Sequence, residues 1–131
     1  MASLQGKWTF KSFENMEAFL NAIDVPEDVK QKAMVLKPDV AISQNGDTWT
    51  FTTTLGDKST DTVFKLDQEF DHQNLMGKII KSKISLEGDK LVETQSGEGE
   101  TITVTREVVG DEMLSTLSAK GVTTVVRFQR A

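Results

Sequence analysis

Arg106 is the residue whose place in the sequence predicts the most specific chemistry. Apolar and polar residues alternate over positions 101–108, and Arg106 shares one set with Val104 and Val108. Successive side chains of a strand point to opposite faces, so we expect Arg106 to face an apolar interior. An arginine there stays charged and needs an anionic or hydrogen-bonding partner. Its planar guanidinium suits a carboxylate, which it binds through two parallel hydrogen bonds.

Two polar residues on a neighbouring segment compete for this arginine. The alternation Leu91, Glu93, Gln95 puts Glu93 and Gln95 on the same face as Leu91. A hairpin centred near Glu98 places Leu91 opposite Arg106 and Glu93 one step diagonal to it. A contact between Glu93 and Arg106 is therefore within reach, and a free acid would then have to share the arginine. Gln95 could join them through a water molecule. Arg106 is thus either a ligand anchor, a structural partner of a protein carboxylate, or a residue of a wet barrel rim.

The composition excludes several classes of site. The chain has 131 residues, no cysteine, one histidine and a formal net charge of −5. Disulfides and thiolate metal sites are excluded, and one histidine cannot build the usual histidine zinc cage. The negative charge opposes nucleic-acid binding, which requires a basic surface. We expect no metal, no cofactor and no nucleic-acid partner.

His72 is the remaining candidate for catalysis. It follows Phe70 at an interval of two, which predicts an inward or rim position. A small hydrolase would combine His72 with an inward serine or threonine. The chain contains no Gly-x-Ser-x-Gly turn and no obvious nucleophile beside this histidine. We therefore expect no enzyme activity.

A helical pair is predicted near the N-terminus. From Phe13 to Val35 the apolar residues recur at spacings of three and four, which indicates two short helices over about residues 13–36. Pro26 and the two carboxylates after it are typical of a helix start. Lys37 and Pro38 end the second helix. The first strand is expected over Gly6–Lys11, so the helices are inserted directly after it.

The rest of the chain is predicted to be β-structure. Short segments rich in threonine, valine and isoleucine recur between turn signals such as Asn45-Gly46 and Gly88-Asp89. About ten antiparallel strands result, and closure into a barrel would protect the sheet edges. A barrel of this size exceeds the ~8 strands whose interior side chains just fill. We expect one domain over residues 1–131, a mainly β ten-stranded up-and-down barrel with a two-helix lid and an internal ligand cavity.

Strand alternation also assigns other interior residues. Phe51 and Thr53 face inward on one strand, and Phe128 faces inward on the last strand with Arg127 outside. Arg106 is predicted to be the only inward arginine.

Several segments resemble the intracellular lipid-binding proteins, which include fatty-acid-, bile-acid- and retinoid-binding members. They are Gly6-Lys7-Trp8-Thr9-Phe10, Phe64-Lys65-Leu66-Asp67-Gln68-Glu69-Phe70 and Thr105-Arg106-Glu107-Val108-Val109-Gly110-Asp111-Glu112. The last is similar to the intestinal fatty-acid-binding branch, whereas the portal segment at 52–58 is more similar to the liver and bile-acid branches. The resemblance implies a lidded barrel, a water-containing cavity, no catalysis and Arg106 as the main carboxylate contact.

The chain departs from this family at four positions. Val126 and Phe128 stand where many members carry an arginine and a tyrosine that bind the carboxylate, so only the Arg106 part of that site is retained. Ser115 stands where the intestinal branch has glutamine, so its hydroxyl would reach the head group through water. Met16 replaces an aromatic residue.

We therefore expect a reversible, non-catalytic cytoplasmic carrier of long-chain fatty acids, or a similar anionic amphiphile, that acts as a monomer. A bile-acid or retinoid carrier of the same fold is the alternative, and a protein-interaction barrel with a filled cavity is a third. Transient membrane contact through the lid is also left open. The predicted ligand-binding residues are Phe51, Thr53, Phe70, His72, Ile84, Glu93, Gln95, Val104, Arg106, Ser115, Leu117, Val126 and Phe128, and the predicted portal residues are Met16, Leu20, Leu55 and Asp57.

Overall fold

The computed structural model describes residues 4–24, 26–35, 37–55, 57–73, 79–96 and 101–131, except for the side chains of residues 29, 33, 55, 72 and 73. Within these ranges the chain forms two helices and ten strands. Their bounds are β1 Gly6–Glu14, α1 Met16–Ala22, α2 Glu27–Val35, β2 Asp39–Asn45, β3 Thr48–Leu55, β4 Lys58–Lys65, β5 Glu69–Gln73, β6 Ile79–Glu87, β7 Lys90–Ser96, β8 Ile102–Val109, β9 Glu112–Ala119 and β10 Val122–Arg130.

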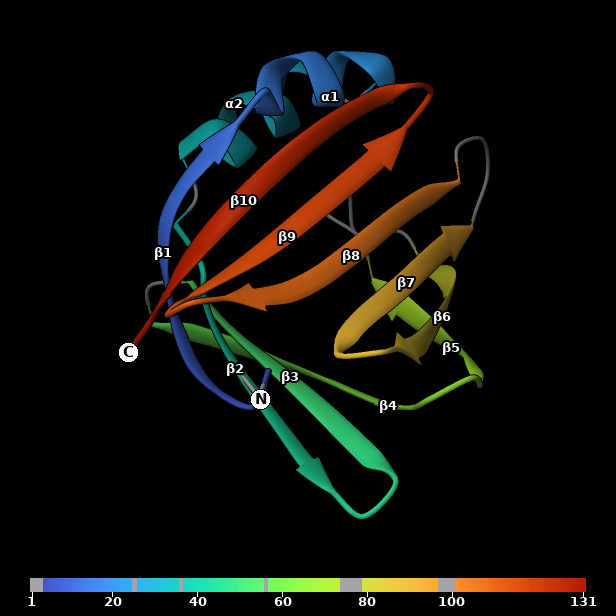
Figure 1. Cartoon of the computed structure of the whole chain (residues 1–131). Helices are drawn as coiled ribbons and strands as arrows, with labels where there is room; N and C mark the ends of the chain where they lie inside the picture. The colour runs from blue at the N-terminus through green and yellow to red at the C-terminus, as the bar shows by residue number, and fades with distance from the viewer. Residues whose placement is uncertain (1–3, 25, 36, 56, 74–78, 97–100) are drawn as a thin grey trace.

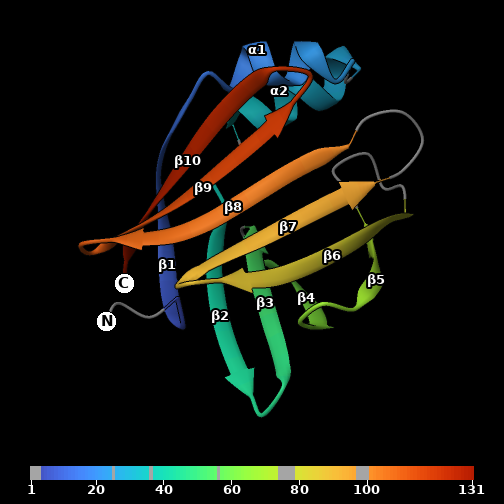
Figure 2. The same ribbon diagram turned by 45° about the vertical axis from the view of Figure 1, so that its right-hand side comes forward.

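The strands form one antiparallel sheet that curls into a barrel. Their order is β4-β3-β2-β1-β10-β9-β8-β7-β6-β5, and both helices lie at one end of the barrel (Figures 1 and 2). This confirms the predicted ten-stranded barrel with a helical pair inserted after the first strand. The predicted closure is incomplete, because β4 and β5 are the two ends of the sheet order. Side chains span this gap instead, since the rings of Phe64 on β4 and Phe70 on β5 stack with centroids 5.5 Å apart.

Tight turns join most consecutive strands, as the sequence predicts. Gly46, between β2 and β3, has a φ of +64°, a left-handed conformation that glycine adopts without a steric penalty. Gly6 is required for a different reason. A Cβ at this position would lie 2.8 Å from Nη1 of Arg130, so a larger residue would displace that guanidinium.

The first strand is longer than predicted. It continues to Glu14 rather than ending at Lys11, and Phe13 pairs with Val126 of β10. The pairing shifts between Phe10 and Ser12, as a β-bulge does by adding one residue to a strand. This extra residue interrupts the period of two, so Phe13 follows Phe10 at a spacing of three that imitates a helix.

The two helices begin near their predicted positions. Asn15 precedes α1 with a φ of +61°, which asparagine tolerates better than most residues, and its carbonyl accepts a hydrogen bond from the amide of Phe19. The carbonyl of Pro26 accepts a bond from the amide of Lys30 and so starts α2. Helix α1 packs on β9 and β10 and contacts α2. Phe19 and Leu20 of α1 are buried against Ala119 of β9, which fixes the helices on the barrel.

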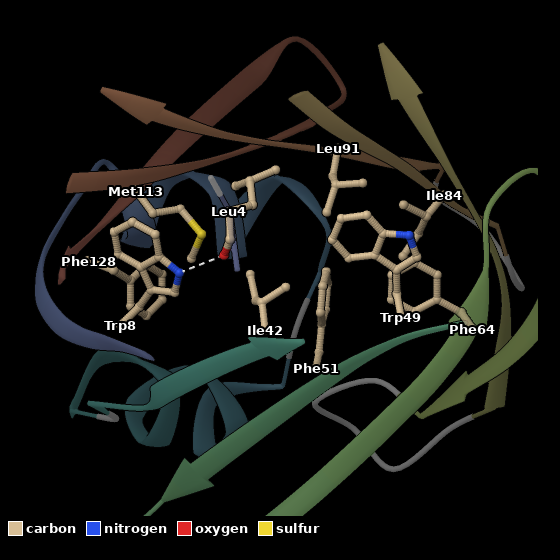
Figure 3. Close-up of a cluster of buried hydrophobic side chains, with 10 residues drawn as sticks. All are labelled: Leu4, Trp8, Ile42, Trp49, Phe51, Phe64, Ile84, Leu91, Met113 and Phe128. Atoms are coloured by element: carbon tan, nitrogen blue, oxygen red, sulfur yellow. Dashed lines mark hydrogen bonds between the residues drawn. The ribbon is translucent and has the colours of Figure 1, made fainter. Parts of the chain in front are cut away.

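The main apolar cluster fills part of the barrel interior (Figure 3). Trp8 is 1% exposed, and its indole nitrogen donates a hydrogen bond to the carbonyl of Leu4 at 2.9 Å. The guanidinium of Arg130 lies 4.1 Å from the centre of the Trp8 ring. Arg130 therefore continues the inward set of Phe128, and the prediction that Arg106 is the only inward arginine is wrong.

Candidate functional site

Arg106, Glu93 and Gln95 form one hydrogen-bonded group inside the barrel. Nη1 of Arg106 lies 2.9 Å from Oε1 of Glu93, and Nε2 of Gln95 donates to Oε2 of Glu93 at 2.8 Å. The Glu93 side chain is 1% exposed, whereas that of Arg106 is 17% exposed. Both carboxylate oxygens of Glu93 thus have a partner, and the guanidinium remains partly accessible.

The pairing of β7 with β8 produces this group. Leu91 pairs with Arg106, and Glu93 pairs with Val104, so Glu93 is the diagonal neighbour of Arg106 on the same face. The contact between Glu93 and Arg106, which the sequence left open as one of three possibilities, is present. Gln95 joins the group by a direct bond to Glu93, where the sequence analysis considered a water bridge.

Two further residues surround the guanidinium. The centre of the Phe51 ring lies 4.7 Å from Cζ of Arg106, which is a cation–π distance. Ser115 of β9 is buried and pairs with Arg106 across the β8–β9 ladder, which places both on one face of the sheet. The arginine is therefore bounded by an aromatic face, a carboxylate and a strand that carries a hydroxyl.

An aromatic wall extends from Phe51 toward the gap between β4 and β5. The Phe51 and Phe64 rings meet edge to face at 5.0 Å, and Phe64 stacks on Trp49 at 6.4 Å as well as on Phe70. Edge-to-face and stacked pairs both contribute beyond the area that they bury. The predicted residues Phe51 and Phe70 belong to this wall, while Trp49 and Phe64 were not predicted as site residues.

The remaining predicted site residues are spread over the barrel interior. Ile84, Val104 and Phe128 are buried, Val126 packs against the main cluster, and Thr53 is partly buried on the inward face of β3. Leu117 packs with the cluster under the helices. The backbone of His72 pairs with Ile80, but its side chain lies outside the described residues.

The predicted portal residues occupy different environments. Leu20 is 1% exposed and anchors α1 to the barrel, so it does not line an opening, and Met16 packs against the same cluster. Asp57 is exposed in the turn between β3 and β4. The side chain of Leu55 lies outside the described residues. A surface groove of about 410 Å³ lies beside the helices, and it is lined by Phe13, Asn15, Met16, Glu17, Ala18, Asn21 and Met34.

Buried polar groups also occur outside the Arg106 group, and Ser82 among them was not predicted. The indole nitrogen of Trp49 and the hydroxyl of Ser82 are buried and have no hydrogen-bond partner among the described atoms. Ser82 pairs with Gln95 on one side and with Phe70 on the other, so it shares their face of the sheet. The spacing of two between Ser82 and Ile84 could have placed Ser82 inside. Thr124, by contrast, lies on the inward set that strand alternation gives for the last strand. It is buried, and its hydroxyl donates to the carbonyl of Glu14.

The described part of the chain offers neither a membrane-spanning helix nor a metal site of several side chains. Neither helix there is long and apolar enough to cross a membrane. No cluster of three or more potential metal-binding side chains occurs among the same residues.

Comparisons with known proteins agree on one family. The family model described as "Lipocalin / cytosolic fatty-acid binding protein family" matches residues 1–130. A fatty acid-binding protein of Lepidoglyphus destructor is 38% identical over 132 residues, with 100% of both chains covered. A liver fatty acid-binding protein 1 of Ambystoma mexicanum is 37% identical over 129 residues, with 98% of both chains covered.

A solved structure extends this likeness to three dimensions. The fatty acid binding protein of Schistosoma mansoni in complex with arachidonic acid is 30% identical and has a TM-score of 0.93. The match covers 100% of this chain and 98% of that chain. The barrel, the helical pair and their order along the chain are therefore shared with a protein that was solved with a fatty acid bound.

Proposed function

Because the chain belongs to the lipocalin and cytosolic fatty-acid binding protein family, we propose that it is a non-catalytic carrier that reversibly binds a long-chain fatty acid inside the barrel. The carboxyl group lies at Arg106, and the acyl chain lies along the aromatic wall that Phe51 begins. The observation that carries this proposal is the partly accessible guanidinium among buried apolar side chains. A guanidinium carries five N–H donors, and the contact with Glu93 is made by Nη1, so further donors are available to bind an acid.

The acyl chain supplies most of the affinity. Each buried methylene contributes about 0.8 kcal/mol, so a chain of about 16 methylenes gains about 13 kcal/mol in total. The freedom lost on association removes at least about 4 kcal/mol of this gain. The head group at Arg106 then selects the orientation of the ligand and the chemistry of its polar end.

The polar interior favours a carrier over a barrel that only binds proteins. Glu93 and Ser115 are buried with Arg106 beside them, and polar groups in a packed core cost stability unless each of them is hydrogen-bonded. The accessible surface of 7636 Å² also exceeds the ~6,900 Å² typical of a monomer of 14.5 kDa. An inner surface that a ligand can reach would account for the difference.

Displacement of a fluorescent fatty acid tests the proposal. Oleate should compete at micromolar concentration, and Arg106→Ala should weaken oleate binding about tenfold or more, because a hydrogen bond to a charged group contributes about 1.5–3 kcal/mol. Arg127→Ala is the matched control, since Arg127 is a β10 arginine that binds Glu14 instead. Competition by a bile salt or a retinoid but not by oleate would replace this proposal with the alternative carrier.

We also propose that the carrier is a cytoplasmic monomer. Light scattering during size exclusion should give the mass of one chain, 14.5 kDa, with and without oleate. A mass of two chains would contradict this. Hydrolysis of an activated ester that is lost in His72→Ala would contradict the absence of catalysis.

A further inference from the structure

The charge of Arg106 is compensated within the barrel before any ligand arrives. Glu93 is almost completely buried, one of its oxygens contacts Arg106, and the other accepts a hydrogen bond from Gln95. A buried carboxylate with two such partners is stabilised in its ionised form. The interior therefore presents a neutral ion pair to the ligand rather than a free cation.

A fatty carboxylate at this site changes the charge balance. Two carboxylates would then share one guanidinium, and the group would carry a net charge of −1 away from bulk water. Two carboxyl groups that share a site cannot both stay ionised without a large penalty, so one of them retains a proton.

The geometry points to Glu93 as the residue that determines the charge of the bound ligand. This inference rests on the proposed function. The site takes up one proton with each fatty acid, and that proton is held between the ligand carboxyl group and Glu93. The free carboxylate, one proton from the solvent and the protein combine. The proton forms an O–H bond with one of the two carboxyl groups, and no bond between heavy atoms changes. For the same reason, an acyl chain that ends in an uncharged amide or hydroxyl group binds the site without the uptake of a proton.

The surroundings of Glu93 limit where this proton can reside. Ile84 of β6 and Val104 of β8 pair directly with Glu93 and carry no charge. The guanidinium of Arg106 contacts its carboxylate. His72 of β5 has a strand position that faces the same interior, because it pairs with Ile80 on the inward set of β6. Arg130 of β10 also belongs to an inward set, but its guanidinium lies on Trp8. A test must therefore separate Glu93 from His72.

Isothermal titration calorimetry in buffers of different ionisation enthalpy measures this proton directly. Between pH 6 and 8 we expect an uptake of about one proton per oleate, and an oleate affinity that falls up to tenfold per pH unit. Oleamide, with the same chain and an uncharged head group, should bind with no proton uptake and no dependence on pH. An uptake of zero with oleate bound would overturn the inference.

Three variants assign the proton. Glu93→Gln should reduce the uptake to about zero and make oleate affinity independent of pH, because Arg106 then pairs with the ligand carboxylate alone. His72→Gln should leave the uptake near one. If Glu93→Gln does not fold, the double variant Glu93→Gln with Arg106→Gln removes both charges. Oleate should then bind more weakly, without proton uptake and without dependence on pH, and a persisting uptake of one proton would overturn the inference.

The results distinguish this inference from the proposed function. If oleate binds the wild type but its uptake is the same in Glu93→Gln, or moves with His72→Gln, the inference is wrong and the carrier function stands. If oleate neither releases heat nor displaces the fluorescent fatty acid, both are wrong.

Discussion

The barrel contains two arginines that lie on aromatic rings, and their partners differ. Arg130 lies on Trp8, and its Nη1 donates to the backbone carbonyl of Gln5. Arg106 lies on Phe51, and its Nη1 contacts the buried carboxylate of Glu93. A backbone carbonyl is a fixed, neutral acceptor, whereas a carboxylate can gain a proton and can be replaced by another acid. Arg130 therefore fixes the C-terminal end of the chain, whereas Arg106 offers a group that can bind a ligand. The two arginines differ in function although both lie on an aromatic ring.

The Trp8 region should dominate stability. Trp8→Ala removes a buried indole, its bond to Leu4 and the ring under Arg130, so we expect the free energy of unfolding to fall by about 3–5 kcal/mol. Urea denaturation measures this change. Trp8→Phe keeps most of the ring and should cost clearly less. Equal losses in the two variants would mean that the hydrogen bond to Leu4, not the packing, stabilises this region.

Substitution of Arg106 should lower the free energy of unfolding by a smaller amount, and that amount should depend on whether Glu93 is present. Arg106→Met leaves Glu93 buried without its cation, and we expect a loss of about 2–3 kcal/mol, below the usual range for buried pairs because Arg106 is partly exposed. Adding Glu93→Gln to Arg106→Met should recover most of that loss. A double-mutant cycle by urea denaturation measures the coupling. Additive losses would show that the two residues do not act as a pair.

Arg130 should affect stability a little and fatty-acid binding not at all. Arg130→Met removes one cation–π contact and a bond to Gln5, so about 1 kcal/mol should be lost from the free energy of unfolding. The oleate affinity should stay within twofold of the wild type. A tenfold loss of oleate affinity in this variant would remove the contrast between the two arginines.

Strand alternation was sufficient to predict the centre of the site. The alternation of inward and outward residues over 91–95 and 101–108 put Glu93 within reach of Arg106. Once the register of two antiparallel strands is known, the residues that face each other follow from it. The same rule applied to β10 would have included Arg130, which follows Phe128 by two. The predicted inward set ended at Phe128, whereas β10 continues to Arg130, so the second inward arginine was not predicted.

Other features depend on contacts that no local pattern encodes. The bulge after Phe10 carries no glycine or proline signal, so the extension of β1 to Glu14 could not be predicted. The gap between β4 and β5 is bridged by Phe64 and Phe70, which are joined by side-chain packing rather than by a ladder. Leu20 was read as a portal residue because its helical spacing shows an apolar face, but not what covers that face.

The smallest predicted effect lies on the helical pair, away from both arginines. Hydrogen bonds from Lys30 and Gln31, together with the charge of Lys30, lower the pKa of Glu27 from its usual value. A carboxyl group with a lowered folded pKa stabilises the protein above its unfolded pKa, and this contribution is lost as the pH falls through the folded pKa. Lys30→Met should raise the pKa of Glu27 toward its usual value in an NMR titration. An unchanged titration would mean that Lys30 does not hold this carboxyl group in solution.

The crystal structure of the complex with oleate tests the central claim most directly. We predict a carboxyl oxygen within about 3 Å of the Arg106 guanidinium, with the acyl chain against Phe51 and the neighbouring rings. An oleate molecule in the groove beside the helices, with the contact between Arg106 and Glu93 undisturbed and side chains filling the barrel, would contradict the account.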